Sequence, residues 1–178
     1  WGAKFRAETG GVLLWMSHPA WPSFVFQLYD YYLNPSAAYF VAKKGCEPLH
    51  ILWNNDTDSI HIVNTTRNSH AGLKAKAAVY SLSGEKAGEQ EIVVNSTAHT
   101  AGKLFDLDIP RGISDVHFIN LTLESMEGEI LSGNFYWRTN KKKDFTQLND
   151  LPVISLTGTS KRENGRINLT LEKKTDIV

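Results

Sequence analysis

The 178-residue sequence lacks most of the features that mark specialised protein classes. A single cysteine, Cys46, cannot form an internal disulfide, so a disulfide scaffold is excluded. The 19 Lys and Arg residues balance the 19 Asp and Glu residues, which argues against a nucleic-acid binder because such proteins need a basic surface. No run of 18 apolar residues and no basic-then-apolar start are present, so neither a membrane span nor a signal peptide is predicted.

Catalytic motifs are absent as well. The sequence has no Gly-rich phosphate loop, no Cys/His metal spacing and no Gly-x-Ser-x-Gly elbow. Its six histidines are scattered singly, so no metal site and no cofactor are predicted. His61 and His117 are assigned to the polar phase of strands and are expected to face solvent. Cys46 is interpreted as a buried structural thiol.

The aromatic residues that are present are unevenly distributed. Residues 1–53 contain 12 of the 19 aromatics and four of the six prolines, whereas the rest of the chain contains seven aromatics. This change in aromatic and proline content after residue 53 predicts a domain boundary. The first part is typical of the edge of a large packed core, and the second of an independent β domain.

Residues 1–47 are predicted to form a strand, a loop and a helix. The apolar run 11–16 suits a strand buried on both faces, as in a parallel sheet. Residues 17–23 contain two prolines and predict a loop. A helix is predicted over 35–44, with Pro35 at its start, lysines in its last turn and Gly45 just after it. One strand–helix unit cannot bury its own faces, so it requires neighbours.

Residues 48–139 alternate apolar and polar side chains with a period of two. Seven short strands are predicted around residues 49–53, 60–62, 73–79, 92–94, 104–107, 119–123 and 135–137. This pattern is typical of an immunoglobulin-like antiparallel β-sandwich in a mainly β protein. Residues 140–178 are predicted to be a polar linker and the first hairpin of a further β domain, with runs 153–156 and 167–171 flanking the turn Asn164-Gly165.

Five asparagines begin an Asn-x-Ser/Thr triplet: Asn55, Asn64, Asn95, Asn120 and Asn168. Glycosylation of a secreted eukaryotic protein is one interpretation. The favoured alternative is that Asn and Thr alternate on the outer faces of strands.

Three segments together resemble glycoside hydrolase family 2. They are GGVLLWMSHPAWPS at 10–23, QLYDYYLNPSAAY at 27–39 and AKKGCEPLHI at 42–51. The subgroup that is most similar is the exo-β-D-glucosaminidases, with β-mannosidases and plant-type endo-β-mannosidases beside it. The resemblance covers about 50 residues closely. It implies that residues 1–47 are the last strand and helix of a (β/α)8 catalytic barrel, joined to the sandwich.

The resemblance also implies a retaining mechanism with two carboxylates about 5 Å apart. In the family both carboxylates lie on earlier barrel strands, so no catalytic residue is expected in this chain. The acidic residues before Pro48 are Glu8, Asp30 and Glu47. Asp30 matches a position with an architectural role.

Substrate contacts are expected from two tryptophans. Trp15 matches the family tryptophan that forms the floor of the sugar subsite, where a sugar ring stacks on the indole face. Trp21 is a weaker candidate for substrate binding. The family usually has Asn or Asp soon after the first tryptophan, and the segment 17–19 departs from this, which leaves the sugar open.

The sequence therefore predicts a non-catalytic C-terminal fragment of a retaining exo-acting glycoside hydrolase whose sandwich supports the barrel. Two alternatives stay open, a carbohydrate-binding sandwich module and a β-mannosidase or β-galactosidase parent. Against the module, residues 54–134 offer only Tyr80, Phe105 and Phe118 as aromatics.

The expected partners are a β-linked oligosaccharide or glycoside, bound through the parent enzyme, and the missing barrel residues. Self-association through the apolar surface of 1–47 is expected as well. The compartment is left open, with a periplasmic or secreted parent among the alternatives.

Overall fold

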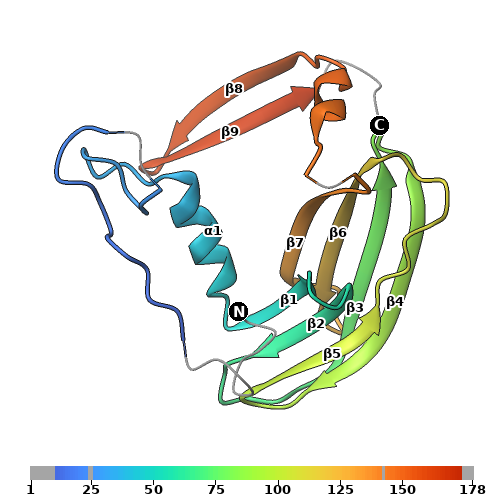
Figure 1. Cartoon of the computed structure of the whole chain (residues 1–178). Helices are drawn as coiled ribbons and strands as arrows, with labels where there is room; N and C mark the ends of the chain where they lie inside the picture. The colour runs from blue at the N-terminus through green and yellow to red at the C-terminus, as the bar shows by residue number, and fades with distance from the viewer. Residues whose placement is uncertain (1–10, 24–25, 142, 174–178) are drawn as a thin grey trace.

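The computed structural model describes residues 11–23, 26–141 and 143–173. The described part is mainly β, with one α-helix near its start and nine strands (Figure 1). In chain order the elements are α1 (Ala37–Gly45), β1 (Leu49–Asn54), β2 (Ser59–Asn64), β3 (His70–Ser81), β4 (Lys86–Ser96), β5 (Thr100–Asp106), β6 (Val116–Glu124), β7 (Ile130–Thr139), the 3₁₀ helix η2 (Thr146–Asp150), β8 (Leu156–Glu163) and β9 (Arg166–Lys173).

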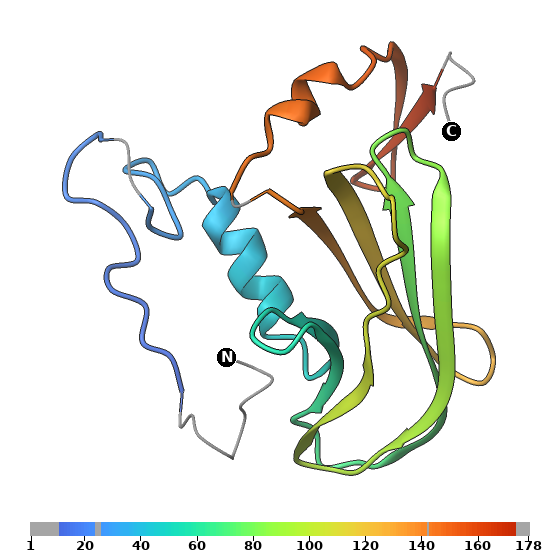
Figure 2. The same ribbon diagram turned by 45° about the vertical axis from the view of Figure 1, so that its right-hand side comes forward.

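Strands β1 to β7 form the predicted antiparallel sandwich. One sheet has the order β1-β2-β5 and the other the order β4-β3-β6-β7 (Figures 1 and 2). Every pairing within the two sheets is antiparallel. All seven predicted strands are present, so the immunoglobulin-like sandwich is confirmed.

The core of the sandwich follows from the period-two pattern. Ile51 and Ile60 from one sheet are fully buried, as are Ile119, Leu121 and Leu123 from β6 of the other. Because side chains alternate across a strand, these positions put one face of each sheet into the core. Apolar packing of these faces joins the sheets.

Helix α1 is formed where the sequence predicts a helix. The Ser36 hydroxyl accepts a hydrogen bond from the backbone N–H of Ala38 at 3.2 Å, which caps the helix N-terminus. Lys43 and Lys44 lie in the last turn, where positive charge favours the helix dipole. The prediction of a buried thiol is wrong, because Cys46 follows the end of the helix and is exposed.

The predicted strand over 11–16 is wrong. Within the described residues 11–23 the backbone forms neither helix nor strand, and Leu13 is fully exposed. A strand exists only through hydrogen bonds to a neighbour, and no described segment pairs with this run. The loop predicted over 17–23 is confirmed.

The expectation that His117 faces solvent is also wrong. His117 is fully buried in β6, two residues before Ile119, and it therefore shares the inward face. His61 is half-buried rather than free in solvent. Asn64 is fully buried, and its amide donates to the carbonyls of Asn68 and Thr97, so the outer-face interpretation does not hold for that triplet.

Strands β8 and β9 form a separate two-stranded hairpin. Its turn is Asn164-Gly165, as predicted, and both residues have positive φ, which favours Asn and Gly. The first strand starts at Leu156, where the predicted run 153–156 ends, so the strand boundary was misplaced. The side chains of the hairpin are largely exposed.

Candidate functional site

The two tryptophans predicted to contact substrate lie on the irregular segment before α1. Trp15 is 79% exposed and Trp21 is 68% exposed. The segment is joined to the next turn by a hydrogen bond from Tyr29 N–H to the Ser17 carbonyl at 3.0 Å. Among the residues that the structure describes, neither indole has a hydrogen-bond partner, and the exposure of both rings leaves surface open for stacking.

Trp15 lines an apolar hollow of about 340 Å³ against helix α1. Leu13, Leu14 and Met16 lie beside it, and Ala38 and Val41 contribute the helix side of the hollow. Trp21 does not line this hollow. The structure therefore brings Trp15, but not Trp21, to the face of α1.

Asp30 acts as a turn residue. Its carboxylate accepts hydrogen bonds from the backbone N–H of Asn34 at 2.8 Å and from the Asn34 side-chain amide at 2.9 Å. These bonds lower the pKa of Asp30. A carboxylate held in this way closes the turn before α1, in line with the architectural role implied by the resemblance.

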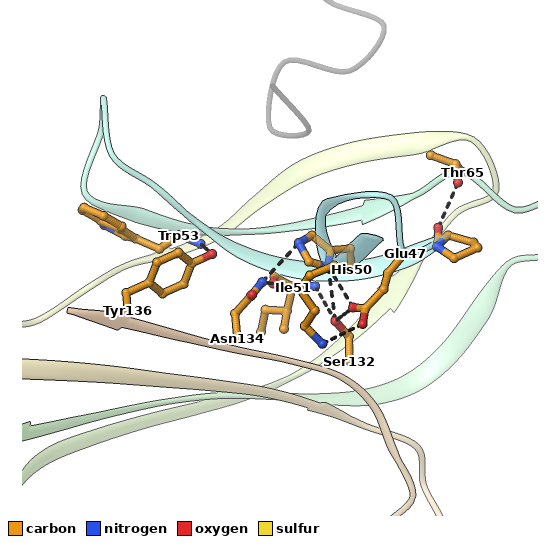
Figure 3. A network of polar contacts seen from close by, with 10 residues as sticks. Glu47, His50, Ile51, Trp53, Thr65, Ser132, Asn134 and Tyr136 are labelled. Atoms are coloured by element: carbon orange, nitrogen blue, oxygen red, sulfur yellow. Dashed lines mark hydrogen bonds and ion pairs between the residues drawn. The ribbon is translucent and has the colours of Figure 1, made fainter. Parts of the chain in front are cut away.

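A polar network joins the end of α1 to the sandwich, and Figure 3 shows it. Glu47 follows the helix, and one carboxylate oxygen accepts from Lys44 Nζ at 2.6 Å. The other oxygen accepts from Ser132 Oγ at 2.8 Å and lies 3.0 Å from His50 Nδ1. We call Glu47, His50, Ser132 and Asn134 the junction clamp.

The tautomer of His50 follows from its neighbours in the clamp. Asn134 Nδ2 donates to the Ile51 carbonyl at 2.6 Å and lies 3.1 Å from His50 Nε2. Since an amide nitrogen only donates, Nε2 accepts and the ring proton is on Nδ1, which donates to Glu47. His50 is nearly fully buried.

Partial burial acts to raise the pKa of Glu47. Hydrogen bonds from Lys44, His50 and Ser132 outweigh this effect, so the pKa of Glu47 lies below its ordinary value of 4.5. The carboxylate is therefore held in its charged form. A general acid needs a raised pKa, so Glu47 is suited to a structural role.

Side chains of β7 also satisfy the open backbone edge of β1. Ile51 N–H donates to Ser132 Oγ at 3.3 Å, and Trp53 N–H donates to the Tyr136 hydroxyl at 3.3 Å (Figure 3). An unpaired strand edge exposes such groups to other chains. Here the alternate residues Ser132, Asn134 and Tyr136 close the edge and tie the two sheets together.

The sequence did not indicate His50, Ser132 or Asn134 as site residues. One signal was available, because Ser132 and Asn134 occupy inward positions of a strand where the pattern calls for apolar residues. Polar residues at such positions need buried partners.

Metal and membrane features are not found in the part of the chain that the structure describes. No three His, Cys, Asp or Glu side chains gather there in a way that could hold a metal ion. None of the helices over these residues has the length and apolarity that a membrane crossing requires.

Comparison with known proteins defines the class of the sandwich. Residues 57–143 match the Mannosidase Ig/CBM-like domain family. The chain is 28% identical to an exo-β-D-glucosaminidase of Hypocrea virens, over 99% of this chain and 23% of that protein. It is 32% identical to an exo-β-D-glucosaminidase of Amycolatopsis orientalis, over 74% of this chain and 13% of that protein.

The fold agrees with these relatives. A solved structure of the exo-β-D-glucosaminidase of Amycolatopsis orientalis superposes with a TM-score of 0.84 at 24% identity, over 97% of this chain and 24% of that chain. The chain thus spans less than a quarter of the curated relatives' length. It belongs to the C-terminal region of glycoside hydrolase family 2 proteins of the exo-β-D-glucosaminidase and β-mannosidase type, as the sequence resemblance implied.

Proposed function

We propose that this chain is the non-catalytic C-terminal part of a retaining exo-acting glycoside hydrolase similar to the exo-β-D-glucosaminidases. Residues 1–47 are the end of the catalytic barrel, residues 48–139 are the supporting sandwich, and residues 140–178 open a further β domain. The substrate of the parent enzyme is a β-linked glucosamine-containing oligosaccharide. A β-mannoside or a β-galactoside is the alternative substrate.

The junction clamp is the observation that supports this role. Glu47 lies at its centre and bonds to the end of α1, to β1 and to β7. A sandwich that only follows the barrel in sequence would need no such network. We infer that the clamp sets the orientation of α1 and thereby supports the segment that carries Trp15.

Catalysis is assigned to residues outside this chain. Over residues 11–47 the structure describes two carboxylates, Asp30 and Glu47, and hydrogen bonds lower the pKa of both. A retaining glycosidase needs a carboxylate pair in which one member acts as an acid.

The test is a hydrolysis assay of the purified chain with nitrophenyl β-D-glucosaminide and nitrophenyl β-D-mannoside. No turnover above buffer is expected, while an exo-β-D-glucosaminidase that contains the barrel provides the positive control. Measurable turnover by the chain would overturn the proposal. Its persistence in the Glu47→Gln variant would assign catalysis to another residue of the chain, and its loss would assign catalysis to Glu47.

A further inference from the structure

A cluster of aromatic side chains lies on the outer face of the four-stranded sheet, away from the core. Tyr80 of β3 pairs with Phe118 of β6, and Phe118 pairs with Trp137 of β7, so the three are aligned across neighbouring strands. Phe135 occupies the next outward position on β7. We call these four residues the outer aromatic face.

The outward direction follows from the alternation along each strand. Val79, Ile119 and Tyr136 belong to the core or pack against it. Their sequence neighbours on β3, β6 and β7 therefore point to the opposite side of the sheet.

The outer aromatic face forms an exposed platform. Trp137 is 60% exposed and Phe135 is 56% exposed. The rings of Phe118 and Phe135 stack with their centroids 5.5 Å apart and 24° between their planes. Exposed apolar patches with polar surroundings mark binding sites, and this platform is the main concentration of rings in a sandwich that has few aromatics.

The charged groups that β3 and β4 place on this sheet face form ion pairs. Glu91 lies 3.5 Å from Lys74 Nζ and 3.4 Å from Lys76 Nζ, and Lys86 Nζ lies 2.9 Å from Glu89. The face is therefore complementary to an uncharged partner rather than to a nucleic acid or a charged peptide. Asn120, opposite Phe135 in the register, adds a half-exposed amide beside the rings.

We propose that the outer aromatic face binds an uncharged β-linked glycan chain. A sugar ring presents an apolar C–H face and a rim of hydroxyls, so the Trp137 and Phe135 rings stack on it and the Asn120 amide hydrogen-bonds a hydroxyl. That the ligand is a β-linked glycan rests on the β-mannoside alternative of the proposed function, because a glucosamine chain carries protonated amino groups, but the binding surface does not. The sequence argument against a carbohydrate-binding module considered residues 54–134, and Phe135 and Trp137 follow directly after them.

The test is an NMR titration of the isotope-labelled chain with β-linked mannohexaose. Chemical shifts are expected to change at residues 118–122 and 133–137. The Trp137→Ala variant should bind at least about tenfold more weakly, a factor that corresponds to ~1.4 kcal/mol. Trp137→Tyr should retain most of the affinity because it keeps a stacking ring, and Val93→Ala, on the edge strand of the same sheet, serves as the matched control.

Three outcomes would overturn the proposal. They are equal affinity of wild type and Trp137→Ala, shifts confined to residues 11–47, and a dimer that Trp137→Ala dissociates without any glycan binding. The last outcome would assign the face to a second copy of the chain. Failure here leaves the hydrolysis assay unaffected, so the two proposals are separable.

Discussion

Glu47 has three hydrogen-bond donors within 3.0 Å, two of which come from outside its own helix turn. Ser132 lies 85 positions away in the sequence. The sequence indicated Glu47 only as an acidic residue near the barrel end. No local pattern could reveal its role, because the partners meet only after β1 and β7 have been placed side by side.

The pH dependence of stability should report the charged state of Glu47. Its pKa is lowered in the folded protein, so the stabilisation is present above the ordinary value of 4.5 and is lost as the pH falls through the lower folded pKa. The Glu47→Gln variant should therefore be less stable than wild type at pH 7, and the difference should shrink below pH 4.5. Urea unfolding of both proteins, followed by circular dichroism at pH 7 and at pH 3, measures this difference in the free energy of unfolding.

The comparison variant is Glu163→Gln, which makes the same charge change on the exposed hairpin. A stability difference for Glu47→Gln that is constant from pH 7 to pH 3 would contradict the assignment of the clamp carboxylate.

At the scale of elements, the sandwich was predictable because alternation with a period of two is a local property of each strand. The helix was predictable for a similar reason, since the residues that cap it and those of its last turn are local sequence signals. The conformation of residues 11–16 was not predictable, because an apolar run forms a strand only when it pairs with other strands. His117 lies two residues before Ile119, so the same alternation places its side chain on the inward face although histidine is polar.

The hydroxyl of Ser36 joins helix α1 to the turn before it. It accepts from Ala38 N–H and donates to the Gln27 carbonyl at 2.7 Å. Ser36→Ala removes both bonds and should lower the stability of the helix by about 1 kcal/mol. Ser36→Asp keeps the acceptor for the Ala38 N–H and removes the donor to the Gln27 carbonyl, so it should retain most of the helix stability.

Hydrogen exchange of the backbone amides over residues 38–46 measures this prediction. Exchange in α1 should be fastest in Ser36→Ala and intermediate in Ser36→Asp. Ser160→Ala on the exposed strand β8 is the control, and equal exchange of all variants would show that the cap does not hold the helix.

At the scale of the whole molecule, apolar surface is concentrated before the sandwich. Leu13 and Val41 line the hollow at α1, and they are 100% and 71% exposed. Such surface favours association, so we expect concentration-dependent self-association of the chain. Sedimentation velocity at several concentrations measures it.

Charge placed in the hollow should abolish this association. Leu13→Glu combined with Val41→Glu should give a monomer, whereas Ile167→Glu on the apolar side of the hairpin should leave association unchanged. The reverse result would assign the contact to the hairpin, and a monomeric wild type would contradict the expectation.

The closure of β1 by β7 has a mechanical consequence. Ile51 contacts Ser132 and Asn134, while Trp53 contacts Tyr136, so the first and last strands of the sandwich run in the same direction side by side. The chain therefore enters at one end of this edge and leaves at the other. A pull between the flanking segments loads these cross-links together in shear instead of opening them one by one. We therefore expect a pull on the two ends of the sandwich to be resisted by all of these hydrogen bonds at once.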